Sequence, residues 1–254
     1  MNNIKVLLSC DDNPFYYNFW NDVSYVWKQI FNFDPVLIYV SDVENNNLSS
    51  ANGQIIRVNK IENIPTYLQA QLARVYYTSL YKNDVCMLSD IDMIPINKSF
   101  FNKEKILEHT KDNSMFHLNP TPREFGQYPM CYYCGTGQAF AFATSDKSWE
   151  NFMKEVVSCN FSVNKLNYNL PSHLKGKDLW FSDELFLYTK LNQTKTNIKI
   201  NNQIIKSFQR LDREQILSLD HKSINNYIDC HMPRPFDLYE KQINYIIHGI
   251  ENAQ

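Results

Sequence analysis

Glycine is scarce in this chain: only six of its 254 residues are glycine, far below the usual share of about 7%. The six are Gly53, Gly126, Gly135, Gly137, Gly176 and Gly249. They form neither a Walker A loop nor a G-x-G-x-x-G turn, because Phe140 stands where Gly135-Thr136-Gly137 would need its third glycine. Both turns bind phosphates through glycine-rich backbone, so the sequence argues against P-loop ATPases, kinases and dinucleotide-binding Rossmann proteins.

Long apolar runs and a surplus of basic residues are also absent. The N-terminus leads only into the short stretch Val6-Leu7-Leu8, whereas a secretory leader needs about 7–15 apolar residues and a membrane-spanning helix about 20. Lys and Arg number 25 against 27 Asp and Glu, which gives a net charge of -2 and disfavours a nucleic-acid binder. We therefore expect a soluble, cytoplasmic protein without a transmembrane segment and without a nucleic-acid partner.

The six cysteines are scattered and do not predict a disulfide framework, so we expect reduced thiols. Cys131 and Cys134 form a single C-x-x-C with no second pair at the spacing of a zinc ribbon. Structural zinc normally takes four protein ligands. The pair is therefore a poor candidate for a metal site.

Apolar periodicity predicts alternating strands and helices. The expected strands are 5–9, 35–40, 54–58, 84–89, 115–118 and 138–143, and the expected helices are 13–30, 65–80, 99–109, 145–157, 182–191 and 236–248, the last ended by Gly249. This alternation predicts an α/β fold with a mostly parallel central sheet flanked by helices. Ligands of such sheets lie beyond the carboxyl ends of the strands, which singles out the turns at 10–13 and 90–92.

Asp90-Ile91-Asp92 is the most informative tripeptide in the chain. Two carboxylates that follow a strand can converge on one hard divalent cation, which in turn binds a diphosphate and neutralises its charge as a leaving group. A surface turn is the alternative interpretation. The preceding strand and the following Met93-Ile94-Pro95-Ile96 are apolar, so the two carboxylates stand inside a hydrophobic run. Unpaired buried carboxylates cost several kcal/mol, and a cation is the simplest compensation.

Two segments carry a resemblance to a known family: Leu72-Ala73-Arg74 with the later 85–92, and Cys10-Asp11-Asp12-Asn13. The first resembles the R-L … L-D-x-D segment, and the second the A-D-D-N-Y turn, of the retaining GT-A glycosyltransferases, in particular the glycogenin, galactinol synthase and lipooligosaccharide galactosyltransferase group. The resemblance implies one glycosyltransferase domain over 1–254. Its nucleotide-binding part would span about 1–98 and its acceptor- and sugar-binding part about 99–254.

The resemblance also implies roles for the residues of the first half. Asp11 and Asn13 would hold the uracil and ribose of a UDP-sugar, although a helix N-cap explains them equally well. Arg74 would reach the donor sugar and diphosphate, with a solvated helical arginine as the alternative. Ser89 and Asp90 would line the nucleotide-sugar, while Asp90 and Asp92 would bind the metal.

Three later segments receive roles in the same way. Gly135-Thr136-Gly137 resembles the N-(A/S)-G turn of the donor-sugar pocket, although the asparagine is missing here. The acidic pair after Trp180-Phe181-Ser182 resembles a D-Q-D segment: Asp183 would bind the sugar or stabilise an oxocarbenium ion, with Glu184 as the second candidate, unless both only favour the start of a helix. The segment 231–235 resembles H-x-x-G-x-x-K-P in shortened form, so His231 would be the third metal ligand and Arg234 would hold the diphosphate.

Together these residues predict a Mn²⁺- or Mg²⁺-dependent glycosyltransferase that moves a sugar from a UDP-sugar to a hydroxyl acceptor. The aromatic segment 119–134 would face the acceptor, and the resemblance implies retention of configuration by front-face attack. Inversion would instead need a general base, either Asp183 or Glu184. Two other functions stay open. One is a nucleotidyltransferase that makes nucleotide-sugars, although the turn at 10–14 lacks the glycines typical of that class; the other is a non-catalytic sugar- or nucleotide-binding module of the same fold.

Overall fold

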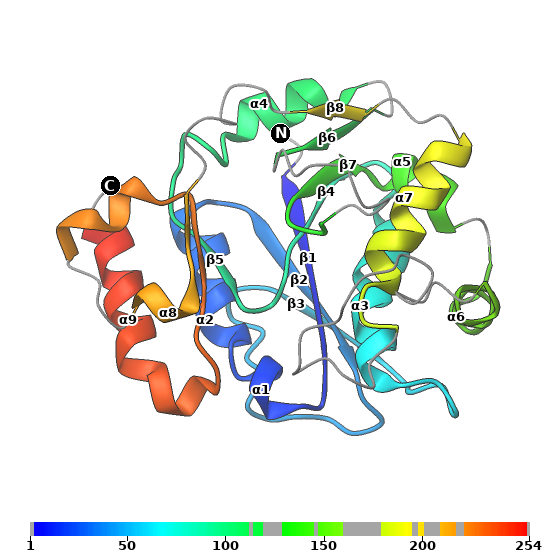
Figure 1. Cartoon of the computed structure of the whole chain (residues 1–254), viewed down its shortest axis with the longest axis horizontal. Coiled ribbons are helices and arrows are strands. Elements are labelled where there is room, and N and C mark those ends of the chain that lie inside the picture. The colour runs from blue at the N-terminus through cyan, green and yellow to red at the C-terminus, as the bar shows by residue number, and fades with distance from the viewer. Residues whose placement is uncertain are drawn as a thin grey trace.

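The computed structural model describes residues 3–111, 114–118, 129–144, 147–159, 179–194, 198–200, 209–216 and 221–252. Within them a seven-stranded sheet forms the centre of the molecule (Figure 1). Its order is β3 (Gln54–Val58), β2 (Asp34–Val40), β1 (Ile4–Asp11), β4 (Val85–Leu88), β7 (Tyr133–Thr136), β6 (Met115–His117) and β8 (Ile198–Ile200). Only the pairs β4–β7 and β6–β7 are antiparallel. The predicted α/β fold with a mostly parallel sheet is confirmed.

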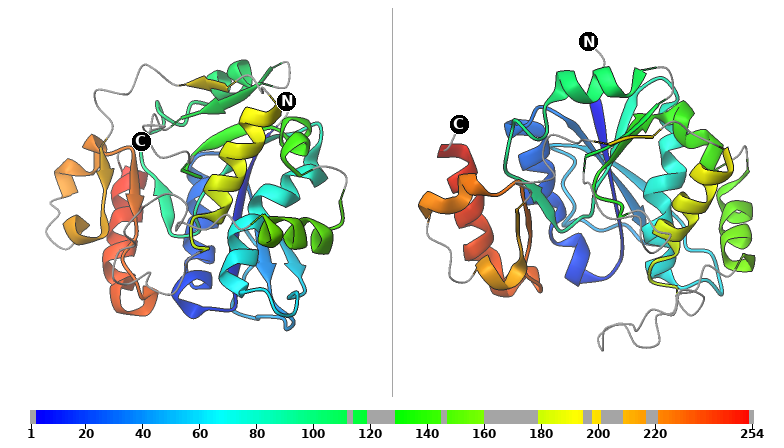
Figure 2. Two further views of the ribbon diagram at one scale, coloured as in Figure 1. Left: turned by 45° about the vertical axis from the view of Figure 1, so that its right-hand side comes forward. Right: turned by 45° about the horizontal axis from the view of Figure 1, so that its top comes forward.

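Helices cover both faces of this sheet, as the views in Figure 2 also show. One face carries α3 (Thr66–Tyr76), α5 (Gly137–Thr144), α6 (Trp149–Ser158) and α7 (Ser182–Thr194), whereas the other carries α1 (Pro14–Tyr17), α2 (Trp20–Tyr25), a π-helical turn (Val26–Ile30) and α9 (Phe236–Asn252). Successive residues of β1 alternate between the two cores: Val6 and Leu8 enter one and Leu7 the other. Burial on both faces explains why the central strands β1 and β4 are mostly apolar.

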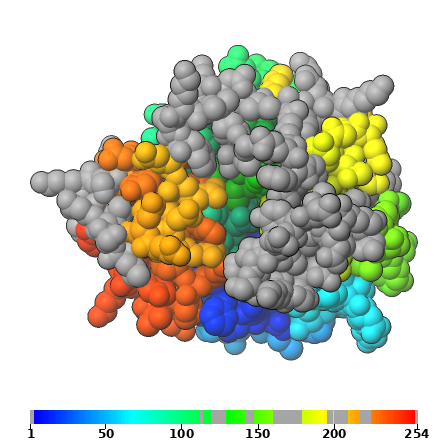
Figure 3. All heavy atoms as spheres, in the orientation of Figure 1, coloured from blue at the N-terminus to red at the C-terminus, as the bar shows by residue number. Residues whose placement is uncertain are grey.

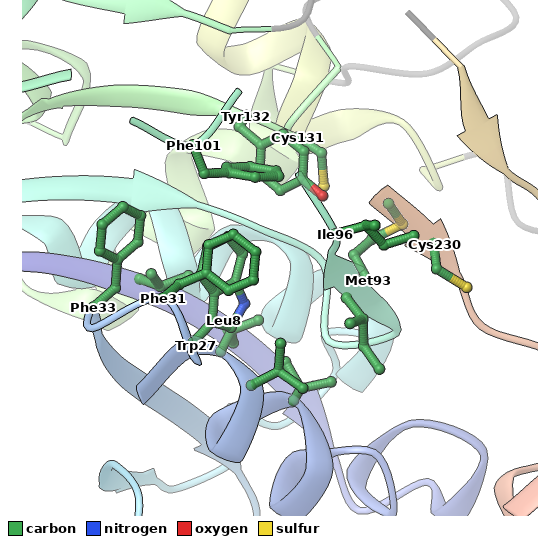
Figure 4. Close-up of a cluster of buried hydrophobic side chains, with 14 of the residues drawn as sticks. Leu8, Trp27, Phe31, Phe33, Met93, Ile96, Phe101, Cys131, Tyr132 and Cys230 are labelled. Carbon is green, nitrogen blue, oxygen red and sulfur yellow. The ribbon is translucent and has the colours of Figure 1, made fainter. Parts of the chain in front are cut away.

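A second, three-stranded sheet lies beside the end of β4. Its strands are β5 (Met93–Pro95), β10 (Asp229–His231) and β9 (Arg210–Leu211), with β10 in the middle, and α8 (Arg213–Ile216) follows β9. β5 and β10 pair antiparallel, with His231 opposite Met93. Figure 4 shows Met93, Ile96 and Cys230 near one another at this sheet. The small sheet thereby fixes the chain on either side of His231 to the chain that follows Asp92.

Three expectations about helices and strands were wrong. Residues 138–143 belong to α5, and the strand is 133–136; the alternation of Ala and Phe fits either structure, and Ala139 and Phe140 are both buried. Helix α4 (Lys103–His109) begins after Asn102, whose side chain accepts a hydrogen bond from Lys105 N (2.8 Å), and not at Ser99. Its delayed start leaves room for Phe100 and Phe101 in the core.

The third wrong expectation is that Gly249 ends the last helix, because α9 continues to Asn252. A Cβ at this position would lie 2.3 Å from Ile224 Cδ1. Glycine therefore permits close packing here and does not act as a helix stop.

The predicted helix over 13–30 is divided into α1, α2 and the π-helical turn, and the one over 65–80 continues beyond α3 as a 3₁₀ turn, Tyr77–Tyr81. All six cysteines are free thiols, and Cys159 alone among them is exposed. In the described ranges we find no helix with the length and apolar character needed to cross a membrane.

Candidate functional site

The turn Ser89–Asp92 leaves β4 at the carboxyl edge of the sheet, and two ion-pair clusters meet there. β4 is central, between β1 and β7, so this turn emerges from the middle of the molecule. The first cluster, around Asp90, joins α3 to α7. The second, around Asp92, joins the β4–β5 turn to α8 and to the segment after β10.

Arg74 is the centre of the first cluster. Its Nη1 donates to Ser89 O (3.0 Å) and to Asp90 Oδ1, and its Nη2 donates to Asp183 Oδ2 (2.9 Å). The side chain of Arg74 is 8% exposed and that of Asp183 3%. The interpretation of Arg74 as a solvated helical arginine is therefore wrong. Cys131, just before β7, completes the cluster by donating from Sγ to Asp90 Oδ2 (3.0 Å).

Asp92 is the centre of the second cluster. Arg213 Nη2 donates to Asp92 Oδ2 (2.7 Å), His231 Nε2 lies 3.4 Å from the same oxygen, and Arg234 Nε lies 3.7 Å from it. Asp92 is 5% exposed. Arg234 also stacks over the ring of Tyr16 at 4.9 Å and donates to its hydroxyl, which fixes this arginine beside α1.

The electrostatic environment keeps Asp90 and Asp92 ionised. Burial raises the pKa of Asp90, but the charge of Arg74 lowers it more, so the pKa lies below its usual value. Burial likewise raises the pKa of Asp92, whereas the hydrogen bond and charge of His231 and then the charge of Arg213 lower it well below the usual range. Both side chains are thus carboxylates at neutral pH, the form that binds cations and donors of hydrogen bonds.

Asp183 and Glu184 behave in the opposite way. Burial raises the pKa of Asp183 in spite of its ion pair with Arg74. Burial, followed by the charges of Asp183 and Asp90, raises the pKa of Glu184 well above its usual value. Burial also raises the pKa of Cys131, which therefore stays a thiol and acts as a hydrogen-bond donor to Asp90. The edge of the sheet thus combines carboxyl groups whose pKa is lowered with carboxyl groups whose pKa is raised.

The structure places Asp11 and Asn13 at the end of β1, as predicted. Asp11 Oδ2 accepts from Thr66 Oγ1 (2.8 Å), and Asn13 Oδ1 accepts from Phe15 N (3.1 Å) and so caps α1. The N-cap role of Asn13 is confirmed. Both residues lie at the same edge of the sheet as Asp90, because β1 and β4 are parallel neighbours.

Gly135, Thr136 and Gly137 do not reach this edge. β7 runs antiparallel to β4, so Thr136 lies opposite Val85 at the start of that strand. Gly137 N donates to Asp84 O (3.1 Å), and a Cβ there would lie 2.4 Å from Tyr81 O. This glycine is required by close packing against the 3₁₀ turn. The prediction that the three residues line the donor-sugar pocket is therefore not supported by their position.

The aromatic residues expected to face an acceptor are also placed elsewhere. Tyr132 and Tyr133 are fully buried, Tyr132 donates to Asp229 Oδ2 (2.9 Å), and Tyr133 stacks on His117 at 4.1 Å between ring centres. They belong to the core. The remainder of the predicted acceptor segment, 119–128, lies outside the described residues.

Sequence reasoning missed Arg213, Cys131 and Tyr16. Arg213 lies 121 residues from Asp92 in the chain, and Cys131 lies 41 residues from Asp90. Arg213 and Tyr16 stand in no recognisable motif, and the C-x-x-C that contains Cys131 does not indicate a contact with Asp90. A single sequence holds no sign of such distant pairs, so only the fold could reveal them.

Asp92 and His231 are spaced as two ligands of one divalent ion would be. Two ligands of one ion at bonds of about 2.1 Å stand about 3.0–3.4 Å apart, and Asp92 Oδ2 and His231 Nε2 are 3.4 Å apart. The other ring nitrogen of His231 lies 3.6 Å from Asp212 Oδ1, the kind of partner that orients a metal-binding histidine. Asp90 is turned toward Arg74. Accordingly, no trio of His, Cys, Asp or Glu side chains in the described part of the chain is arranged to hold a metal.

The fold and the site define an α/β protein with an arginine-rich, acidic site at the carboxyl edge of its central sheet. No protein-family model and no curated protein matches the chain. A solved structure of the galactosyltransferase LgtC in complex with donor and acceptor sugar analogs is similar: identity is 11%, the TM-score is 0.48, and the match covers 98% of this chain and 95% of that chain.

A second similar structure is a glycosyltransferase involved in the glycosylation of the major capsid of PBCV-1. Its identity is 11% and its TM-score 0.46, with 96% of this chain and 98% of that chain covered. These structural neighbours are glycosyltransferases. At this level of identity the similarity concerns the course of the chain and assigns no role to any residue.

Proposed function

We propose that this protein is a glycosyltransferase that moves a sugar from a nucleotide-sugar, in the first instance a UDP-sugar, to a hydroxyl group of a glycan or other acceptor. One observation carries the proposal: Asp90 and Asp92, on the turn that leaves the central strand, are met by Arg74, Arg213 and Arg234 from three other segments. Ionised carboxylates beside guanidinium groups at this edge suit a nucleotide diphosphate. The resemblance of 10–13 and 85–92 to GT-A glycosyltransferases supports the same conclusion.

The residues around Asp92 would bind the diphosphate half of the donor. Asp92 and His231 would hold Mn²⁺ or Mg²⁺, with the phosphates supplying further ligands, as is usual for Mg²⁺. Such an ion, when bound, stabilises negative charge on the leaving diphosphate. Arg234 presents a bidentate fork to phosphate oxygens, and its stacking on Tyr16 holds that fork in place.

The residues around Asp90 would bind the sugar half. Arg74 holds Asp90 and Asp183 in fixed positions. The side chain of Asp90 is 41% exposed, so the second lone pairs of its oxygens can accept hydrogen bonds from sugar hydroxyls. Asp183 is already paired with Arg74, and burial favours the neutral form of Glu184, so neither is a free general base. We therefore propose retention of configuration by front-face attack, which NMR of the product anomer would test.

Isothermal titration with UDP, with and without Mn²⁺, tests the site. We expect wild-type protein to bind UDP, to bind it more tightly with Mn²⁺, and to lose at least about tenfold in affinity on Asp92→Asn. Asp34→Asn is the matched control, since Asp34 pairs with Lys28 (2.7 Å) at the amino end of β2, the opposite edge of the sheet. Affinity that ignores both Mn²⁺ and Asp92→Asn would contradict the proposal.

Turnover is tested by metal-dependent hydrolysis of a panel of UDP-, GDP- and dTDP-sugars. We expect release of nucleoside diphosphate from UDP-sugars at the highest rate. Binding of UDP without hydrolysis of, or transfer from, any sugar nucleotide would favour a non-catalytic binding module. Formation of a nucleotide-sugar from a nucleoside triphosphate would instead identify a nucleotidyltransferase.

A further inference from the structure

Arg213 occupies the position at which an ion between Asp92 and His231 would lie. Its Nη2 donates to Asp92 Oδ2 (2.7 Å) and contacts His231 Nε2, and its Nε donates to Met232 O (3.0 Å). These bonds hold the guanidinium group against both atoms that the proposed function assigns to metal binding. The arrangement joins α8 to the segments that follow β4 and β10.

The contact with His231 occupies Nε2, the ring nitrogen that faces Asp92. Asp212 Oδ1 lies 3.6 Å from the other ring nitrogen, Nδ1. A divalent ion between Asp92 and His231 would bind through the lone pair of the same Nε2. Arg213 and an ion therefore cannot both use this nitrogen.

Asp92 imposes the same exclusion through its charge. The side chain of Asp92 is 7% exposed, so its charge needs a positive partner at all times. The oxygen that Arg213 contacts, Oδ2, is also the one that lies nearest His231. The side chain of Arg213 is 30% exposed and can turn toward solvent, whereas Asp92 cannot. Of the two partners, Arg213 is the one able to leave.

We infer that Arg213 is the resident counter-cation of Asp92 and His231 and that it exchanges with the divalent ion when the ion binds. The inference rests on the proposed function, because it concerns the same metal site. The exchange keeps Asp92 paired in both states. It also frees a guanidinium group beside Arg234, where the donor diphosphate would accept its hydrogen bonds.

The test is the affinity for Mn²⁺ without nucleotide, measured by electron paramagnetic resonance of free Mn²⁺. We expect Arg213→Gln to bind Mn²⁺ about tenfold more tightly than wild type, because the variant removes a positive charge that competes for both ligands. Arg213→Lys keeps the charge but lacks the fork, so its affinity should lie between the two. Arg57→Gln, which removes an exposed arginine that donates to Asp42 O, is the matched control and should equal wild type.

Thermal unfolding supplies a second measurement. Added Mn²⁺ should stabilise Arg213→Gln more than wild type, since the variant has lost the competing cation. Equal or weaker Mn²⁺ affinity of folded Arg213→Gln, while wild type binds Mn²⁺ and UDP, would overturn the inference and leave the proposed function intact. Binding of UDP without Mn²⁺ binding by any variant would overturn both the inference and the metal site.

Discussion

Replacing Arg74 by methionine tests the ion-pair network that holds α3, β4 and α7 together. The substitution removes the guanidinium group and leaves Asp183, which is 3% exposed, with no cation in contact among the partners described above. Loss of one partner of a buried ion pair costs about 3–5 kcal/mol. Asp90 adds little to this loss because its side chain is 41% exposed. We therefore expect the free energy of unfolding at pH 7 to fall by about 3–5 kcal/mol.

The same reasoning gives the pH dependence and the control for this variant. Burial already raises the pKa of Asp183, and loss of Arg74 would raise it further, so the destabilisation should diminish as the pH falls and Asp183 takes up a proton. Arg74→Met/Asp183→Asn should recover part of the loss, since no buried charge remains. Lys154→Met breaks the exposed pair with Glu150 and should cost less than about 0.5 kcal/mol.

Urea denaturation followed by circular dichroism measures these free energies, and an unchanged m-value shows that the variants are comparable. A loss below about 1 kcal/mol for Arg74→Met, the size typical of an exposed pair, would refute the reasoning. So would a double variant that is no more stable than Arg74→Met alone.

The remaining predictions concern packing and acid stability, each read from urea denaturation. Tyr132→Phe leaves one bond of the fully buried Asp229 unmade and should cost about 1.5–3 kcal/mol while UDP binding stays unchanged; a neutral result would contradict this. Gly137→Ala should lower the free energy of unfolding more than Gly249→Ala does. The new Cβ at 137 would lie 2.4 Å from a backbone oxygen, whereas the one at 249 would meet a side-chain methyl that can move. Equal losses of stability would show that the close approach at Gly137 is unimportant. The pKa of Asp92 is lowered in the folded protein, so its contribution to the free energy of unfolding is fully present above the unfolded-state pKa of 3.8 and is lost as the pH falls below that value. Asp92→Asn should therefore lose less stability than wild type when the pH is lowered through this range.

The sequence predicted the part of the fold that depends on local apolar pattern and burial. In the runs at 4–11, 34–40 and 85–88 every buried residue except Asp11 is apolar, which is typical of central parallel strands. Once these were strands, the rule for parallel sheets placed Asp11 and Asp90 at one edge, and the structure confirms that placement.

Patterns that fit two structures, and contacts between distant segments, escaped prediction. The alternating Ala and Phe of 138–143 satisfy a strand, but Gly137 packs against the 3₁₀ turn and starts a helix there. The reversed direction of β7 then removes the 135–137 turn from the site, which no local pattern could indicate. Arg213 escaped for a different reason: its partners Asp92 and His231 become neighbours only through the small sheet of β5, β10 and β9.

The position of that small sheet also changes the argument for a metal. The sequence predicted an external cation because two acidic residues stand inside an apolar run. In the folded chain, Arg74 already neutralises Asp90 and Arg213 already neutralises Asp92. Burial of the carboxylates is therefore no longer evidence for an ion, and the geometry of Asp92 Oδ2 and His231 Nε2 takes its place.

Charge balance then predicts how ion and nucleotide bind. Asp92 is a single carboxylate between two guanidinium groups, those of Arg213 and Arg234, so a divalent ion would be added beside positive charge that is already present. Figure 3 shows the C-terminal segment that contains α9, which follows Arg234 in the chain, adjoining the N-terminal segment of α1 on this face. A divalent ion alone would increase the positive charge around Asp92, whereas a nucleoside diphosphate would offset that charge. We therefore expect Mn²⁺ and UDP to bind cooperatively, each raising the affinity for the other by the same factor, because the coupling free energy between two ligands is reciprocal. Titrations of each ligand in the presence and absence of the other measure this coupling: the affinity for Mn²⁺ and the affinity for UDP should rise by the same factor, although the two affinities for the free protein differ. Independent binding of the two ligands would refute a shared site at Asp92.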